Sequence, residues 1–469
     1  MFLNENDKTA RRSAAAKSKT EARRKLLDIL AELPETSSNR LPPLPTAGTP
    51  RRGPVVVLVP AMPPTVPHSD DERGLKFFFH RFVTAVSGVQ GSSYDLESAP
   101  LLKTIPVEAP LRNAVVSIGL GALSNVTMDR TLMALAREKY LAAINVVRGA
   151  VENPGKANSF QIFKVIVMLS LYEMVCCSPD QIDAWTVHVD GVVALLKQAT
   201  FGLSLKATDP RGRIQFYLIT VVRYFMAPGV LSPDIKDWSP DDFPSSETDL
   251  QPAIQLVDML VRFMKFHSSL SFNLDTDNQN VIQFASSLDD EMEIWERNLP
   301  EKWIFVVKES GDLQHTFNGK YVLYNDLWVS RDLNYYHWGR LMLNELILEH
   351  LAKNQYPTLG HLKQRQQAME TVSRMATAIC AGAASQMGGI GCGAPVKSRT
   401  RVPPLNGVFM LLFPLTLAGS AAGAPDEVQA WVIKTFEKIG LTMGIQRALV
   451  LIPKLEQDRA RKRRQLNME

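Results

Sequence analysis

The sequence predicts an all-α protein, a multi-helix array that follows a disordered, basic and Pro-rich N-terminal segment. From about residue 72 onward, apolar residues recur with the three-and-four spacing of amphipathic helices. Few stretches alternate apolar and polar residues with the period of two that is typical of strands. The segments 213–226 and 332–353 are long and rich in apolar residues, which favours helices within such an array.

Residues 1–70 differ in composition from the rest of the chain. The stretch 8–30 is basic and Ala-rich with an amphipathic end, and it can form a short helix. The stretch 34–54 is rich in Pro, Ser and Thr and has too few apolar side chains to offset the entropy lost on ordering. We therefore expect most of this region to be disordered.

The helical pattern begins with an aromatic segment. In the stretch 71–86, Leu75, Phe78 and further phenylalanines follow helical spacing. The stretch 111–124 is apolar nearly all round, as expected of a helix buried in the core. The stretch 131–151 has apolar residues on or near one face with charged residues opposite or beside it, which predicts a third helix.

A buried helical hairpin is predicted around "LSLYEMVCCSPDQIDAWTVHVDGVVALLKQ", residues 169–198. The stretch 160–175 is almost wholly apolar, which is typical of a helix buried on all sides. Ser178 can cap the second helix, with Pro179 at its first position and Gln181 completing a capping box.

The second helix of this hairpin carries the polar aromatic residues. Trp185 and Val189 follow three-and-four spacing, and His188 lies one turn from Trp185 at the border of the apolar stripe. Trp185 and His188 could bind a ligand, but their place on the stripe favours a packed aromatic beside a hydrogen-bonded core histidine. Gly191 weakens a helix, so we expect a neighbouring helix to approach closely there.

The chain has four cysteines, Cys176, Cys177, Cys380 and Cys392, and no C-x-x-C pair. We expect four reduced thiols in a cytosolic or nuclear protein. Cys176 and Cys177 could sense oxidants, but no nearby basic residue favours a thiolate, so apolar filling at a helix end is the preferred interpretation. The net charge of +4 does not by itself indicate nucleic-acid binding.

The stretch 402–425 is uncharged and long enough to span a bilayer. Pro403, Pro404, Pro414 and several glycines interrupt it. Because proline and glycine break helices, the stretch favours a buried, broken helix pair, and we predict no membrane association.

Six segments occur along the chain in a characteristic order. In chain order they are "FFFHRFV", "AVVSIGLGALS", the hairpin pattern of "LSLYE", Trp185, His188 and Gly191, then "LDDEMEIWERNLPEKW", "YNDLWVSRDLNYYHWGRLMLNELIL", and "LLFPLTLAG" with "WVIKTFEKIGLTMGIQRAL". Together they resemble the regulatory domain of fungal-specific transcription factors, which lies C-terminal to a zinc binuclear cluster. The structural signature residues that carry the resemblance are Tyr172, Trp185, His188, Gly191, Pro414, Trp431, Gly440 and Gly444.

The resemblance implies a nuclear transcription regulator that controls a metabolic or secondary-metabolite pathway without a cofactor. It also implies a small-molecule effector and protein partners or a homodimer. Members of the family read DNA through six cysteines that hold two zinc ions, whereas all four cysteines here follow residue 175. We therefore expect DNA contact only indirectly or through a missing zinc cluster: either the true start lies upstream, or the regulator lacks a DNA reader.

Three parts are predicted: a linker-like segment 1–70, the helical regulatory domain 71–455 and a basic tail 456–469. The candidate contacts for an import receptor or for phosphate groups in the tail are Arg461, Lys462, Arg463 and Arg464. The alternative is a solvated helix end, because cations suit a helix C-terminus.

The sequence leaves two alternative functions open. A helical cofactor or binding module that never contacts DNA is the first alternative. The second is an all-α, magnesium-dependent isoprenoid synthase, because the acidic run 289–293 and the stretch 325–330 imitate its two metal motifs. Asn334 stands where the second motif needs glutamate, and the two motifs are too close in sequence. We therefore predict that the chain is not an enzyme, and we assign no catalytic, cofactor-binding or metal-binding residue.

Overall fold

A computed structural model describes residues 69–82, 110–153, 159–197, 210–226, 238–240, 243, 248–272, 277–311, 316–324, 327–354, 356–387 and 407–466. Within these ranges the chain forms thirteen α-helices and one two-stranded hairpin, so the predicted all-α class is confirmed. Almost all of the segment 1–70, for which disorder is predicted, lies outside the described residues.

The helices follow one another along the chain with few other elements. Their bounds are α2 (Asp70–Phe82), α4 (Pro110–Thr127), α5 (Arg130–Glu152), α6 (Ser159–Val175), α7 (Ala184–Lys197), α8 (Pro210–Met226), α10 (Gln251–Phe272), α11 (Asn278–Arg297), α12 (Leu327–Ala352), α13 (Leu359–Gln386), α14 (Val408–Ser420), α15 (Asp426–Met443) and α16 (Gln446–Gln465). The antiparallel strands β1 (Val306–Glu309) and β2 (Lys320–Leu323) lie between α11 and α12, with Val306 opposite Leu323.

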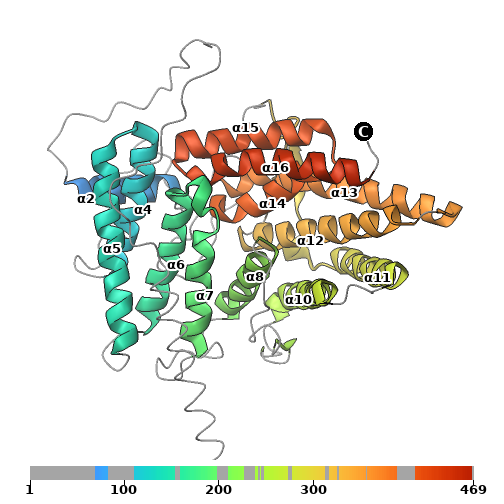
Figure 1. The fold of residues 1–469 in the computed structure, drawn as a ribbon, viewed down its shortest axis with the longest axis horizontal. Helices are drawn as coiled ribbons and strands as arrows, with labels where there is room; N and C mark the ends of the chain where they lie inside the picture. The colour runs from blue at the N-terminus through green and yellow to red at the C-terminus, as the bar shows by residue number, and fades with distance from the viewer. Residues whose placement is uncertain are drawn as a thin grey trace, which may run out of the picture.

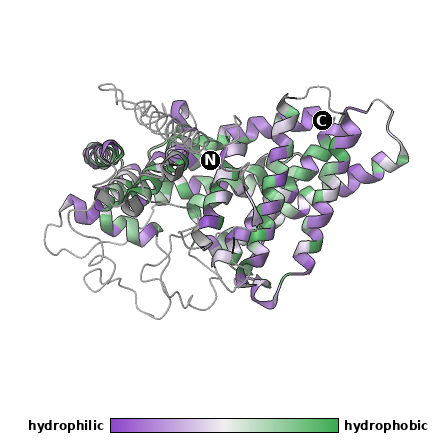
Figure 2. Ribbon diagram, turned by 90° about the horizontal axis from the view of Figure 1, so that it is seen from below, coloured by the Kyte–Doolittle hydropathy of each residue, from purple (hydrophilic) through white to green (hydrophobic). Residues whose placement is uncertain are grey.

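Two groups of helices share one continuous apolar core. The first group packs α2, α5 and α6 against α4, and the second packs α11 and α13 against α12 (Figure 1). Helices α14, α15 and α16 pack together beside the second group, and α15 and α16 reach back to α4 and α6. Apolar residues from α2 through α16 belong to a single buried cluster, and hydrophilic residues lie along the outer faces (Figure 2).

The predicted hairpin is present, but its connection differs from the prediction. Helix α6 ends at Val175, a 3-10 turn spans Pro179–Gln181, and α7 begins only at Ala184. The predicted capping box is wrong, because the Ser178 side chain makes no capping hydrogen bond. The backbone N–H of Gln181 donates to the carbonyl oxygen of Ser178 instead (3.0 Å), which closes the short turn without the hydroxyl group.

The uncharged stretch contains one buried helix, α14, with Pro414 inside it. Residues 402–406 lie outside the described part, and the segment 421–425 after α14 is not helical. Helix α14 lies in the core with nearly every side chain buried, so its apolar composition is explained by packing. Among the described helices, none has both the length and the apolar character that crossing a bilayer requires.

Candidate functional site

The signature residues of the hairpin lie inside the protein. The Tyr172 ring stacks on Tyr140 of α5 with ring centroids 4.2 Å apart, and Trp185 and His188 are each 3% exposed. The Tyr140 hydroxyl donates to the Glu173 carboxylate, and the His188 Nε2 atom lies 3.5 Å from the same carboxylate oxygen. This network joins α5, α6 and α7 through hydrogen-bonded Tyr140, Glu173 and His188, whereas the buried indole N–H of Trp185 has no hydrogen-bond partner among the described residues.

Trp185 links the hairpin to the last helix. The guanidinium group of Arg447 in α16 lies 5.4 Å from the centroid of the Trp185 ring, a cation–π contact. Arg447 also donates to the carbonyl oxygen of Ile182, in the turn before α7. Trp185 and His188 line neither of the two larger cavities described below, and their contacts join α7 to α5, α6 and α16.

The described cysteines are protonated thiols that pack among other side chains of the protein. Burial raises the pKa of the Cys176 thiol to about 12 and that of Cys177 to about 11, so both stay protonated at neutral pH. Cys380 is also buried and unpaired, and burial raises its pKa. Cys392 lies outside the described residues. Cys177 is buried and Cys176 is partly exposed. A protonated thiol is a poor nucleophile, which argues against a reactive site at these two cysteines.

The other signature residues also occupy packing positions. Gly191 is buried in α7. The indole N–H of Trp431 donates to the Thr316 carbonyl oxygen (3.1 Å), which ties α15 to the chain before β2. A side chain at Gly440 would collide with Leu449 of α16, and Gly444 has a φ of 77° at the end of α15.

The basic cluster at the end of the chain belongs to α16 rather than to a separate tail. The boundary expected between 455 and 456 falls inside this helix. The Lys462 Nζ atom lies 2.7 Å from Glu345, Arg463 pairs with Asp426 at 2.6 Å, and Arg461 pairs with Asp458 at 2.9 Å. Arg464 is exposed. Three of the four candidate contacts therefore already have carboxylate partners within the chain.

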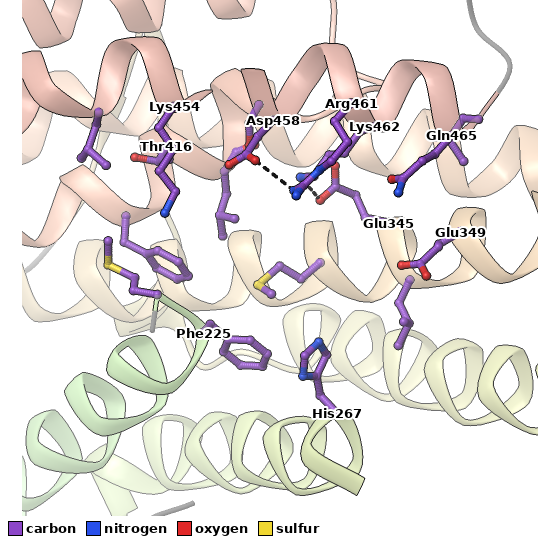
Figure 3. Close-up of a pocket in the computed structure, with 18 of the residues that line it drawn as sticks. Phe225, His267, Glu345, Glu349, Thr416, Lys454, Asp458, Arg461, Lys462 and Gln465 are labelled. Carbon is purple, nitrogen blue, oxygen red and sulfur yellow. Dashed lines mark hydrogen bonds and ion pairs between the residues drawn. The ribbon is translucent and has the colours of Figure 1, made fainter. Parts of the chain in front are cut away.

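The sequence-based reasoning missed an open groove that lies where α8, α10, α12, α14 and α16 meet (Figure 3). Its volume is about 450 Å³, which falls in the range of small-molecule sites. Aromatic and aliphatic side chains from all five helices line it, namely Phe225, Met226, Phe263, Met342, Leu346, Phe413, Leu417, Leu451 and Leu466. The groove can therefore bury an apolar molecule of moderate size.

Charged residues from α12 and α16 form the rim of this groove. Figure 3 shows Lys454 and Thr416 toward one end and Glu349 and Gln465 toward the other. The pair between Lys462 and Glu345 joins the two helices between these ends. Because this pair is mostly buried, it fixes the spacing of the groove walls more firmly than an exposed ion pair would.

His267 and Glu345 are two of the polar residues that line the groove. The Nδ1 atom of His267 lies 3.1 Å from the Tyr224 hydroxyl, and burial lowers the pKa of His267, so its ring is neutral at pH 7. The Glu345 side chain is 16% exposed. Its Oε2 atom accepts from Lys462, whereas its buried Oε1 atom has no hydrogen-bond partner among the described residues.

A second cavity, of about 550 Å³, lies between α11, α12 and α13 and contains the acidic run that imitates a magnesium motif. Asp289 accepts two hydrogen bonds from the buried guanidinium group of Arg340, at 2.6 and 2.7 Å. This carboxylate therefore neutralises a buried cation instead of facing the cavity as a free ligand. Asn325 and Asp326 lie outside the described residues, and those that are described contain no cluster of three or more metal-binding side chains.

Comparisons with known proteins leave the resemblance as a prediction. No protein-family model matches the chain, and no curated protein or solved structure matches it either.

Proposed function

We propose that this chain is the helical regulatory region of a nuclear transcription regulator of the fungal zinc-cluster type, controlled by a small molecule that binds the groove. The observation that supports the proposal most directly is the groove itself, an open site of about 450 Å³ whose walls come from five helices. A ligand that contacts several helices can bias their relative packing, provided that it binds one arrangement more tightly than another.

Transcription by a reporter gene tests the regulatory part of the proposal. The full chain is fused to an unrelated DNA-binding domain in yeast, and reporter output is compared with that of the DNA-binding domain alone. We expect reporter output to rise or fall. We expect Trp185→Ala to abolish this change because it removes the ring that packs between α7 and Arg447 of α16. Unchanged output from a fusion that is shown to be folded would contradict the proposal.

Nuclear import is the second part of the proposal. Arg461 and Arg464 are the exposed members of the basic cluster, whereas Lys462 and Arg463 are partly buried and paired. An import receptor recognises accessible cations, so Arg461→Gln with Arg464→Gln is expected to lower nuclear accumulation of a fluorescent fusion. Lys164→Gln serves as a control for a general effect of charge, and an unchanged distribution in both variants would remove this cluster from the import mechanism.

A binding module that never reaches DNA is the second candidate. The observation behind it is that the four cysteines of this chain all follow residue 175 and do not form the six-cysteine pattern of a zinc cluster. Cross-linking of the tagged chain to chromatin separates the two candidates. Recovery of defined promoter fragments supports a regulator that reaches DNA through a partner, and recovery of no promoter DNA supports the binding module.

A further inference from the structure

We infer that two copies of this chain associate through β1, by antiparallel pairing of their β1 strands about Val307. The surface is the outer edge of β1, and its partner is a second copy of the same chain. None of the β1 residues lines the groove, so this interface is separate from the small-molecule site and does not depend on the proposed function.

The two edges of the hairpin have different surroundings. Strand β2 packs on α13, where the Ser385 hydroxyl group donates to the carbonyl oxygen of Val322. Strand β1 pairs with β2 alone, and all four of its residues are exposed. Within the described residues, no hydrogen bond from another element reaches the backbone of Val307 or Glu309. An open strand edge of this kind is a template for pairing with another chain.

The register of the hairpin shows which backbone groups face the open edge. The Ser310 N–H donates to the Gly319 carbonyl oxygen (2.7 Å), which makes these opposite residues a hydrogen-bonded pair. Because the two kinds of pair alternate along an antiparallel ladder, Val307 and Val322 form a non-hydrogen-bonded pair. The carbonyl oxygen of Val322 accordingly points away from β1, toward Ser385. The N–H and C=O groups of Val307 therefore point the other way, to the open edge.

Apolar side chains accompany these unpaired backbone groups. Ile304, Val306 and Val307 are 54%, 49% and 53% exposed. Val307 lies opposite Val322, so the two side chains share one face of the hairpin, and Val322 is only 4% exposed. The apolar face that α13 covers at β2 thus continues onto β1. A strand added to the edge of β1 would pack beside Val307 and bury it.

The charges of β1 select the register of the pairing. Since alternate residues face outward, the two-fold axis passes through one residue, which then lies opposite itself. Pairing about Lys308 or Glu309 would set like charges directly opposite each other, which is destabilising. Pairing about Val306 would set Glu309 opposite Trp303, which belongs to the 3-10 turn before β1. Pairing about Val307 avoids both conflicts and satisfies its outward N–H and C=O groups.

Cysteine substitutions in the full chain test this pairing under oxidising conditions. Opposite residues of a hydrogen-bonded pair have Cα atoms about 5.5 Å apart, a distance that a disulfide can bridge. We expect Val307→Cys to form a disulfide-linked dimer on a non-reducing gel. Val306→Cys and Lys308→Cys are the matched controls and should stay monomeric, because these positions lie opposite each other rather than opposite themselves. The wild-type chain, with its four cysteines, gives the background.

Light scattering over a dilution series measures the association without a covalent link. A strand of four residues is a small part of the roughly 1,200 Å² that specific interfaces bury, so we expect a dimer fraction that falls on dilution. Val307→Pro removes an N–H that faces outward and keeps the ladder with β2, so it should give a monomer. Val307→Thr keeps the N–H and the branched shape and should still dimerise. Circular dichroism checks that both variants are folded.

Three results would overturn the inference. The first is a wild-type chain that stays monomeric at every concentration, with no cross-link in Val307→Cys. The second is a dimer that persists in Val307→Pro, which would place the interface elsewhere. The third is a cross-link at Val306→Cys or Lys308→Cys instead of Val307→Cys, which would contradict pairing about Val307. None of these results bears on the reporter experiment, so the two proposals can fail independently.

Discussion

Two adjacent tyrosines in α12 differ in the hydrogen bonds that their buried hydroxyl groups make. The Tyr336 hydroxyl donates to Glu296 (2.6 Å) and accepts from Arg340 (3.0 Å). The Tyr335 hydroxyl is equally enclosed but has no hydrogen-bond partner within the described residues. A buried hydroxyl group without a partner loses its hydrogen bonds to water and forms none in the protein, which destabilises the folded state. A buried hydroxyl group that is hydrogen-bonded offsets that cost.

Replacement of each tyrosine by phenylalanine therefore has a different expected result. Tyr336→Phe is expected to lower the free energy of unfolding by about 1 kcal/mol or more, because it leaves Glu296 and Arg340 with one partner fewer. Tyr335→Phe is expected to leave it unchanged or to raise it slightly. Urea unfolding of the two variants gives the comparison, and an equal loss in both would contradict the assignment of the bonds.

His337 makes the folded state sensitive to acid. Burial, together with the positive charges of Arg340 and Arg374, lowers the pKa of His337 to about 3. A histidine in the unfolded chain titrates near pH 6.5. Between these two pH values the His337 ring is protonated in the unfolded chain and neutral in the folded protein. The free energy of unfolding is therefore highest above pH 6.5 and decreases as the pH falls below that value.

Unfolding experiments at pH 7 and pH 5 measure this effect. At pH 5 the proton on the unfolded chain favours unfolding by about 2 kcal/mol for this one residue. We expect the difference in unfolding free energy between the two pH values to shrink by about that amount in His337→Gln. If the free energy of unfolding changed equally between pH 7 and pH 5 in wild type and variant, His337 would be protonated at pH 5 in the folded protein as well.

At the residue scale, the sequence was informative about burial and silent about pairing across helices. The spacing of Trp185 and His188 predicted core positions, and both residues are buried. The acidic residues Glu345 and Glu349 repeat with a spacing of four in the mostly apolar C-terminal half of α12, which was a usable signal of one polar stripe. The contact of this stripe with Lys462 depends on how α12 lies relative to α16, and no local sequence pattern contains that information.

At the scale of elements, the ends of three helices meet at one side chain. The Asn125 amide group of α4 donates to the carbonyl oxygen of Val175 at the end of α6 (2.9 Å) and to that of Gly444 after α15 (2.8 Å). Gly444 ends α15 in the left-handed conformation, and its backbone approaches Ala122 of α4 closely. Both features need a residue without a side chain at position 444.

Gly444→Ala is therefore expected to destabilise the protein by about 2 kcal/mol or more, from the left-handed backbone and from the collision with the Ala122 carbonyl oxygen. Gly149→Ala is the matched control, because this glycine lies in α5 with open space where the methyl group would go. It is expected to stabilise the helix by about 0.5 to 1 kcal/mol. Thermal unfolding of both variants should show shifts of opposite sign, and shifts of the same sign would contradict this packing.

Helices were easier to predict from the sequence than the connections between them. The apolar run before Val175 and the spacing after Trp185 predicted α6 and α7, because burial dictates those patterns. The connection was mispredicted because Ser178, Pro179 and Gln181 suit both a capping box and a short 3-10 turn. Only the position of α7 against its neighbours selects the turn.

At the scale of the whole molecule, α16 joins parts that are far apart in the sequence. Arg447 reaches the turn before α7, Lys462 reaches α12, and Arg459 is buried with hydrogen bonds to Ala424 (2.6 Å) and Asp426 (2.8 Å). The basic residues that the sequence suggested as a separate tail are thus part of the packed structure. Carboxylates on α12, α15 and α16 itself pair with three of these basic residues and partly neutralise their charge.

Deletion of residues 456–469 is expected to lower the free energy of unfolding by about 3 kcal/mol or more, because it removes the buried Arg459 and Leu466 and the pair with Glu345. Arg461→Gln with Arg464→Gln is the control, and it is expected to change the free energy by less than about 1 kcal/mol since both side chains are exposed. Guanidinium unfolding checks both. A deletion as mild as the control would mean that the last three turns or so of α16 are dispensable.

The groove has a consequence for the way in which the protein is made. Four of its helices precede α16 in the chain, and α16 supplies the remaining wall. A ribosome releases the chain from its N-terminus onward, so α16 emerges after every other wall of the groove has left the exit tunnel. A nascent chain that stops before residue 446 has no finished site, and a molecule that fits the groove can be captured only once translation has moved past this helix.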